Sequence, residues 1–165
     1  MAIQATDFRI GNAVKYKGDA GIYFVAGIDG WRRIFASIED ERLYNASIEK
    51  QIKSTKTAQY HDERLIRLAG GARTGEQYIE SKIGGIALTP ELLIDKCGFS
   101  YNDKNKFYWK TWGTNGIVIL LYDEHYKAFK IELGKHNYRV LDYLHTLQNG
   151  YHFLTCGEEL PIKNL

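Results

Sequence analysis

The segment LTPELLIDKCGF, residues 88–99, contains a helix start signal, a short helix and a helix stop signal. Thr89 is a good N-cap because its hydroxyl oxygen accepts a hydrogen bond from a free backbone N–H. Pro90 suits the first helical position, where no donor is needed. Gly98 can adopt the left-handed conformation that ends a helix. A helix of about two turns is marginal on its own, so we expect it to pack on the sheet that follows.

The residues after this helix predict an antiparallel meander and a second helix. Residues 107–112, 117–122 and 129–133 have the apolar or alternating patterns of strands, with a hairpin loop at 123–125. Residues 139–155 then predict a helix, because apolar side chains recur at spacings of three and four. These apolar residues are Val140, Leu144, Leu147, Tyr151 and Leu154.

The beginning of the chain predicts short strands joined by glycine-rich turns. Residues 12–17, 22–28 and 31–38 are expected strands, and Asp29-Gly30 is the expected hairpin turn between the last two. Residues 42–48 are the candidate for a fourth strand. Such a succession is typical of a small curled sheet or barrel, similar to SH3-like modules.

Residues 49–83 show no clear periodicity. They contain a spaced series of cations that comprises Lys50, Lys53, Lys56, Arg64 and Arg67. The loop GGARTG at residues 70–75, which includes Arg73, either offers backbone N–H groups to an anion or serves as a flexible connector. It is not a phosphate-binding P-loop, because the Gly-Lys-Ser/Thr ending is missing.

The whole pattern predicts an α+β protein of two modules. Residues 1–84 are expected to form a β-rich, SH3-like barrel module that ends in the basic, glycine-rich connector. Residues 85–165 are expected to form a module with the order helix, antiparallel meander, helix.

Composition restricts the environment and the partners. Hydrophobic residues make up 44% of the chain, so it can bury a core, and a net charge of +2 is too small to indicate nucleic acid by itself. No apolar run approaches the roughly 20 residues that span a bilayer, and no signal peptide is visible. Cys97 and Cys156 lack metal-binding spacing. We therefore expect a location in the reducing cytoplasm and no membrane partner.

Three groups of residues carry a family resemblance. Arg9-Ile10-Gly11-Asn12 is similar to an N-terminal "RIGN" motif, and residues 88–90 with 97–99 resemble a "PLTPEWLxKxGF" signature. Residues 144–160 resemble a C-terminal "VHxLQNxYxxLTGEEL" signature. Together these motifs are typical of a family of phage and mobile-element proteins of gut bacteria without an assigned activity. Ala87 stands where the family has proline, and Cys156 is inserted before Gly157.

The family resemblance implies a phage or mobile-element origin and hence the cytoplasm of a bacterial host. It implies no activity, substrate or cofactor. Residues 49–83 match no part of the family pattern, so a function particular to this chain would lie there.

The strand at residues 107–112 carries the main candidate binding surface. Tyr108, Lys110 and Trp112 share one of its faces, and Phe107, Trp109 and Thr111 share the other. One face must pack on the helices. If the face with Tyr108 is exposed, its rings can stack on a flat ligand while the ammonium group attracts phosphate. The alternative is that helices or a partner subunit cover both faces.

Two further groups of candidates lie outside this strand. Trp31 and Arg33 repeat the aromatic and basic chemistry in the first module, and Arg73 of the glycine-rich loop would join them. His145, Gln148 and Asn149 form a polar stripe on the last helix, where they either contact the sheet or recognise a ligand.

Neither a metal site nor a catalytic site is predicted. His145 and His152 are seven residues apart, about 10 Å along a helix, so one metal ion cannot bridge them. Cys97 is expected at a helix C-terminus, where the dipole does not lower the thiol pKa. We therefore expect no catalytic residue and no cofactor.

These observations favour a non-enzymatic phage accessory protein that sequesters a small, flat, anionic ligand of the nucleotide type, as an anti-defence function. A homodimer seam that encloses this ligand fits a chain of this size. One alternative is a nucleic-acid-binding module that uses the SH3-like part and the basic residues 50–67. The other is a structural or protein-interaction role, in which the aromatic face meets another protein.

Overall fold

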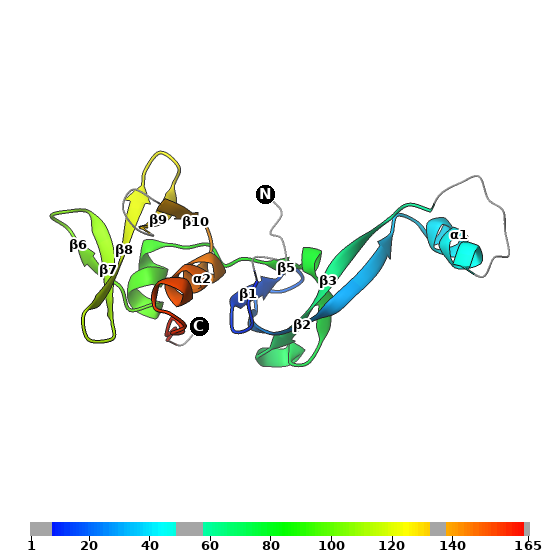
Figure 1. Cartoon of the computed structure of the whole chain (residues 1–165), viewed down its shortest axis with the longest axis horizontal. Helices are drawn as coiled ribbons and strands as arrows, with labels where there is room; N and C mark the ends of the chain where they lie inside the picture. The colour runs from blue at the N-terminus through cyan, green and yellow to red at the C-terminus, as the bar shows by residue number, and fades with distance from the viewer. Residues whose placement is uncertain (1–7, 49–57, 133–137, 164–165) are drawn as a thin grey trace.

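The structure is a computed structural model that describes residues 8–48, 58–132 and 138–163. It contains two five-stranded antiparallel sheets and few helices, so the α+β class is confirmed. The second sheet, helix α2 (Leu144–Leu154), the first sheet and helix α1 (Ile38–Ile48) follow one another along the long axis of an extended molecule (Figure 1).

The first sheet has the strand order β4-β3-β2-β1-β5. Its strands are β1 (Ala13–Tyr16), β2 (Ile22–Phe35), β3 (Tyr60–Ala69), β4 (Gln77–Ile79) and β5 (Ile83–Gly84). β4 and β5 remain edge strands, so the sheet is open rather than closed into the expected barrel. Its core consists mainly of buried aliphatic and aromatic residues, among them Val14, Tyr23, Val25, Ile66 and Leu68.

The predicted hairpin turn at Asp29-Gly30 is wrong, because β2 continues through it. The register with β3 shifts between Ile28 and Trp31, as a β-bulge does, and Gly30 has a φ of +125°. The Asp29 carboxylate accepts hydrogen bonds from Arg67 at 2.9 Å and from Gln77 at 2.7 Å. Side chains of β3 and β4 therefore hold Asp29 within the sheet, and a dipeptide that favours turns is accommodated as a bulge.

The predicted strand at residues 42–48 is also wrong, since these residues belong to α1. Ser37 begins the helix: its Oγ accepts from the Asp40 N–H at 3.1 Å and donates to the Asp40 carboxylate at 2.5 Å. Three acidic residues in the first turn also favour the helix N-terminus. β3 lies in the region without periodicity, whereas Lys50, Lys53 and Lys56 lie outside the described residues.

The second sheet is a meander in chain order. Its strands are β6 (Ser100–Asn102), β7 (Phe107–Trp112), β8 (Gly116–Asp123), β9 (Ala128–Glu132) and β10 (Tyr138–Leu141). The three predicted strands are confirmed, and β6 and β10 extend them. The predicted helix at 139–155 begins only at Leu144, because residues 138–141 pair with β9. Val140 is 48% exposed on that strand and does not belong to the apolar face of α2.

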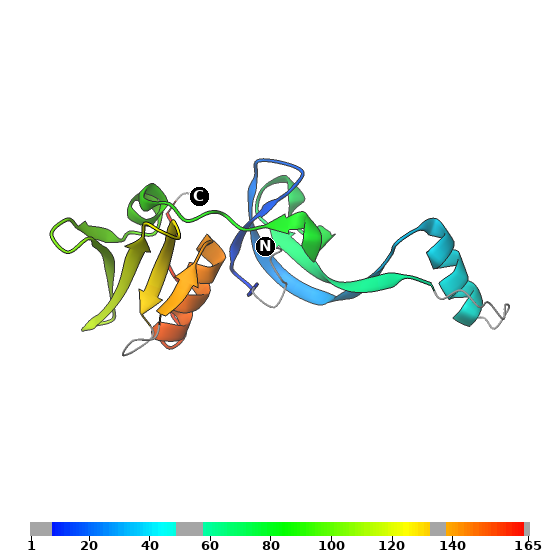
Figure 2. The same cartoon turned by 90° about the horizontal axis from the view of Figure 1, so that it is seen from above.

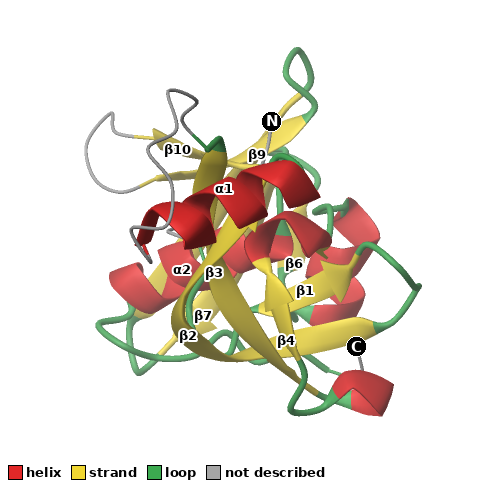
Figure 3. Cartoon of the chain, turned by 90° about the vertical axis from the view of Figure 1, so that its right-hand side faces the viewer, coloured by secondary structure: helices red, strands yellow, loops and turns green. Residues whose placement is uncertain are grey.

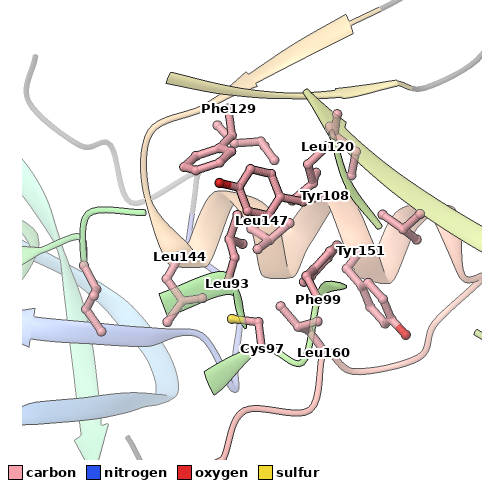
Figure 4. Close-up of a cluster of buried hydrophobic side chains, with 14 of the residues drawn as sticks. Leu93, Cys97, Phe99, Tyr108, Leu120, Phe129, Leu144, Leu147, Tyr151 and Leu160 are labelled. Carbon is pink, nitrogen blue, oxygen red and sulfur yellow. The ribbon is translucent and has the colours of Figure 1, made fainter. Parts of the chain in front are cut away.

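The segment LTPELLIDKCGF is capped as predicted. The Leu92 N–H donates to the Thr89 hydroxyl at 3.2 Å, and the Phe99 N–H donates to the Leu93 carbonyl at 2.9 Å beyond Gly98, whose φ is +68°. The helical residues end in the π-helical turn η4 (Leu92–Lys96). Figure 4 shows this turn and α2 packed together against side chains of the second sheet.

Helix α2 ends in a strained cap that a substitution can relieve. Cys156 is exposed and has a φ of +56°, and the following Gly157 N–H donates to the His152 carbonyl at 2.9 Å. A side chain in this left-handed conformation costs about 1 kcal/mol relative to glycine.

We therefore expect Cys156→Gly to raise the free energy of unfolding by about 1 kcal/mol, measured by guanidinium chloride denaturation. Cys156→Ser, which removes the thiol and keeps the Cβ, should leave the stability unchanged. A destabilised Cys156→Gly variant would show that the conformation of this cap carries no strain.

Candidate interaction surfaces

The predicted platform of Tyr108, Lys110 and Trp112 faces the core. Tyr108 is only 7% exposed, and its ring lies 5.5 Å from that of Phe129, centroid to centroid. The Lys110 ammonium group donates to the Gly98 carbonyl at 3.4 Å, and burial lowers the pKa of Lys110. Trp112 packs partly on the same core. The proposed exposure of this face is therefore wrong, and Figure 4 shows Tyr108 among the buried side chains.

Trp112 also borders a hollow of about 440 Å³ beside the beginning of β8. The charged residue that lines this hollow is Glu132, and its other lining residues are Gly116, Ile117, Val118, Ile119 and Leu154. A carboxylate repels phosphate, so the hollow does not suit an anionic ligand.

The opposite face of the second sheet, here called the outer face, carries the exposed apolar residues. Strand alternation and the sheet register place on it Phe107, Trp109, Thr111, Ile117, Ile119, Leu121, Lys130, Glu132 and Val140. In the described part of the chain, α2 and η4 both pack on the other face. Ile117 is 59% exposed, and a hollow of about 300 Å³ lies between Asn102, Phe107, Trp109, Ile117 and Ile119.

A second surface is the arm, defined as residues 30–48 and 58–64. From Trp31 to Phe35, β2 pairs only with β3 among the described strands, and the resulting ribbon projects from the first sheet with α1 at its end (Figures 1 and 2). Figure 3 shows α1 at the near end of the molecule, seen along its long axis. Of the described residues of α1, none is buried.

An aromatic cluster fixes α1 on the ribbon. The rings of Phe35, Tyr44 and Tyr60 lie 5.4–6.0 Å apart, and the Arg33 guanidinium stacks over Tyr44 at 4.6 Å and over Tyr60 at 4.3 Å. Arg33 also forms an ion pair with Asp62 at 3.1 Å. The predicted ligand cation Arg33 is thus bound within its own arm. Trp31 is 63% exposed, and its ring lies under the Arg64 guanidinium at 5.1 Å.

Arg73 is also engaged within the first sheet. It lies in the connection between β3 and β4, forms ion pairs with Asp19 at 2.6 Å and Glu76 at 3.4 Å, and stacks over Tyr16 at 4.2 Å. The hydrogen bond from Arg73 holds the pKa of the Asp19 carboxyl below its usual value. The loop therefore closes a local network, and its arginine is not directed at an open anion site.

His145, Gln148 and Asn149 join α2 to the beginning of the chain. The Gln148 Oε1 accepts from the Ala13 N–H at 2.8 Å, and its Nε2 donates to the Gly11 carbonyl at 3.2 Å. Asn12 donates to the Asn149 Oδ1 at 3.0 Å. His145 is buried, with its ring 5.0 Å from that of Phe8. We call the contacts of residues 9–13 with 148–149 and Glu159 the clamp.

The clamp unites the motifs that carry the family resemblance. Arg9 and Asn12 of the "RIGN" motif meet Asn149 of the "LQN" segment, and Arg9 forms an ion pair with Glu159 at 2.6 Å. Composition and periodicity gave no sign that Arg9 and Asn12 matter. Only the "RIGN" motif singled out these two residues. In the structure they contact Asn149 and Glu159.

The remaining candidates for chemistry are the Cys97 thiol and the residue types that bind metal ions. Burial raises the pKa of the Cys97 thiol to about 11, which disfavours the nucleophilic thiolate. Across residues 8–48, 58–132 and 138–163, no three His, Cys, Asp or Glu residues gather to hold a metal ion.

Fold and surfaces define an α+β protein with two open sheets, a projecting arm and an apolar sheet face that no described helix covers. Comparisons of the chain with family models, with curated proteins and with solved structures find no match. The family resemblance therefore stays a prediction from the motifs. Within the described residues, neither helix is long and apolar enough to cross a bilayer.

Proposed function

We propose that this chain is a non-enzymatic protein that binds another protein through its arm. The observation that carries the proposal is the arm itself. A two-stranded ribbon has little stability in water without a further surface to pack on. Trp31, Ile38 and Ile48 nevertheless expose more than half of their surface on this one projection, and large apolar side chains exposed in this way favour an interaction site.

A nucleotide-type ligand receives less support from the geometry. The nine candidate residues lie in four places: the arm, the β3–β4 connection, the buried face of β7 and helix α2. Arg33 and Arg73 are paired with carboxylates of the chain, and Lys110 lies partly buried against Gly98. No common cavity joins these groups in the described part of the chain.

Binding of nucleic acid by the SH3-like part also receives less support than binding of protein. Nucleic-acid affinity depends on cations that neutralise phosphates. In and beside the arm, Arg33 is paired with Asp62 and Arg67 with Asp29, and the first turn of α1 is acidic. The described surface of the arm therefore carries both signs of charge, which suits a protein partner.

The family resemblance supports a phage or mobile-element origin for the protein and a location inside a bacterial host. It favours a phage accessory protein that acts in the cytoplasm of a bacterial host, with a host or phage protein as the partner of the arm.

Affinity purification from a bacterial lysate tests the proposal with three versions of the full chain. These are the wild type, the arm variant Trp31→Ala/Ile38→Ser, and Ile94→Ser, which alters an exposed isoleucine of η4 as a control. We expect a near-stoichiometric protein to be retained by the wild type and the control and to fall about tenfold with the arm variant, a loss of about 1.4 kcal/mol.

Two results would overturn the proposal. One is that every retained protein is held equally by the arm variant. The other is that mass spectrometry of the released material finds a nucleotide, or a nucleic acid whose retention falls steeply with salt.

A further inference from the structure

The outer face has a composition that solvent-facing sheets lack. An antiparallel sheet that is wet on one side alternates apolar and polar residues along each strand. In β8 both faces are apolar: Val118 and Leu120 are buried under α2, whereas Ile117, Ile119 and Leu121 point outward. Phe107 and Trp109 of β7 extend this apolar surface. Such strands are typical of sheets covered on both sides.

The register of the sheet orders the outer face into two rows. Phe107 pairs with Leu121, and Leu121 pairs with Lys130, which makes the first row. Trp109 pairs with Ile119, and Ile119 lies at the level of Glu132, which makes the second row. Each row runs from an aromatic ring through an aliphatic side chain to a charge, and the two charges are opposite.

We propose that the outer face is the seam of a homodimer, in which two copies pack face to face about a two-fold axis that runs across the strands. A two-fold axis between the rows lays the first row of one copy on the second row of the other. Phe107 then meets Trp109 of the second copy, and Leu121 meets its Ile119. Lys130, which is bound to Asp123 at 2.5 Å, meets Glu132 of the second copy.

This arrangement satisfies what a two-fold interface requires, because the same patch must complement itself. Two twisted sheets pack in this way about 10 Å apart, as in a β-sandwich. Five strands with about five residues each give a face of about 24 by 17 Å, or about 400 Å² per copy. Two copies then cover about 800 Å² of one another, which is the size of a weak interface.

The position of the outer face allows this dimer to form without the arm. α2 lies between the second sheet and β1, so the outer face is directed away from the first sheet and the arm (Figure 1). The inference is therefore independent of the proposed function: a dimer through this face leaves both arms exposed at its two ends.

Sedimentation equilibrium of the full chain tests the seam. At about 100 µM, where an interface of micromolar affinity is formed, we expect twice the chain mass of 19.0 kDa. Glu132→Lys places like charges opposite each other and should raise the dissociation constant at least tenfold. The double variant Lys130→Glu/Glu132→Lys restores unlike charges across the seam and should regain most of the affinity. A purely local role for either residue changes the free energy of unfolding of the monomer and leaves the dissociation constant of the dimer unchanged.

Glu124→Lys is the matched control, because it makes the same charge change at the exposed β8–β9 turn outside both rows. It should sediment as the wild type does. A wild type that is monomeric at about 100 µM, a Glu132→Lys variant that dimerises as well as the control, or a double variant no better than the single one would each overturn the proposal.

Discussion

Tyr108→Ala is expected to lower the free energy of unfolding by about 3–5 kcal/mol, as removal of a large buried ring does. The side chain is 7% exposed, and its ring contacts Phe129 and Tyr101. Tyr108→Phe keeps the ring and should cost less than about 1 kcal/mol, because no hydroxyl contact is needed for the packing. Guanidinium chloride unfolding, followed by circular dichroism, measures both values.

The neighbouring residue provides the control for this prediction. Trp109 points to the outer face from the same strand, so Trp109→Ala should cost far less stability in the monomer than Tyr108→Ala. Similar losses for the two variants would contradict the assignment of the buried face. A stable Tyr108→Ala variant would restore Tyr108 as a candidate surface residue.

Gln148→Leu is expected to cost about 1–3 kcal/mol, although leucine has nearly the same volume. The side chain is 3% exposed and satisfies both the Ala13 N–H and the Gly11 carbonyl. Leucine leaves the buried Ala13 N–H without a partner, at a cost of about 1–3 kcal/mol, whereas the exposed Gly11 carbonyl can bind water instead. Because Gln148 lies between the two sheets, unfolding should also separate into two transitions.

Hydrogen exchange of the Ala13 amide gives a local measurement of the same effect. In the wild type this amide should exchange only with global unfolding, and in Gln148→Leu it should exchange orders of magnitude faster. Phe153→Leu, on the exposed side of α2, should change neither stability nor exchange. An Ala13 amide that stays protected in Gln148→Leu would show that the clamp does not depend on Gln148.

Local signals predicted the parts of the fold that depend on neighbours in sequence. The caps at Thr89 and Gly98 need only residues within one helical turn, and the strands β7, β8 and β9 follow from alternation and apolar runs. The apolar face of α2 from Leu144 onward follows from its spacing. Each of these elements has its own local sequence pattern, so it could be predicted from the sequence without knowledge of distant contacts.

Contacts between distant residues decided the elements that were predicted incorrectly. Asp29-Gly30 forms a bulge because Arg67 and Gln77 hold the aspartate, and no pattern near residue 29 reveals these partners. Alternation in β7 separates Tyr108 from Trp109, but only the position of α2 determines which of the two is buried. The roles of Gln148 and Asn149 depend on residues at the other end of the chain.

The two sides of β1 have a consequence for the order of folding. Val14 belongs to the core of the first sheet, whereas its neighbour Ala13 belongs to the core beneath α2. During synthesis the ribosome releases all strands of the first sheet well before it releases Gln148. A nascent chain that ends before α2 therefore has a β1 strand that is packed on the Val14 side but not on the Ala13 side. The two halves of the molecule can pack together only after α2 has been translated.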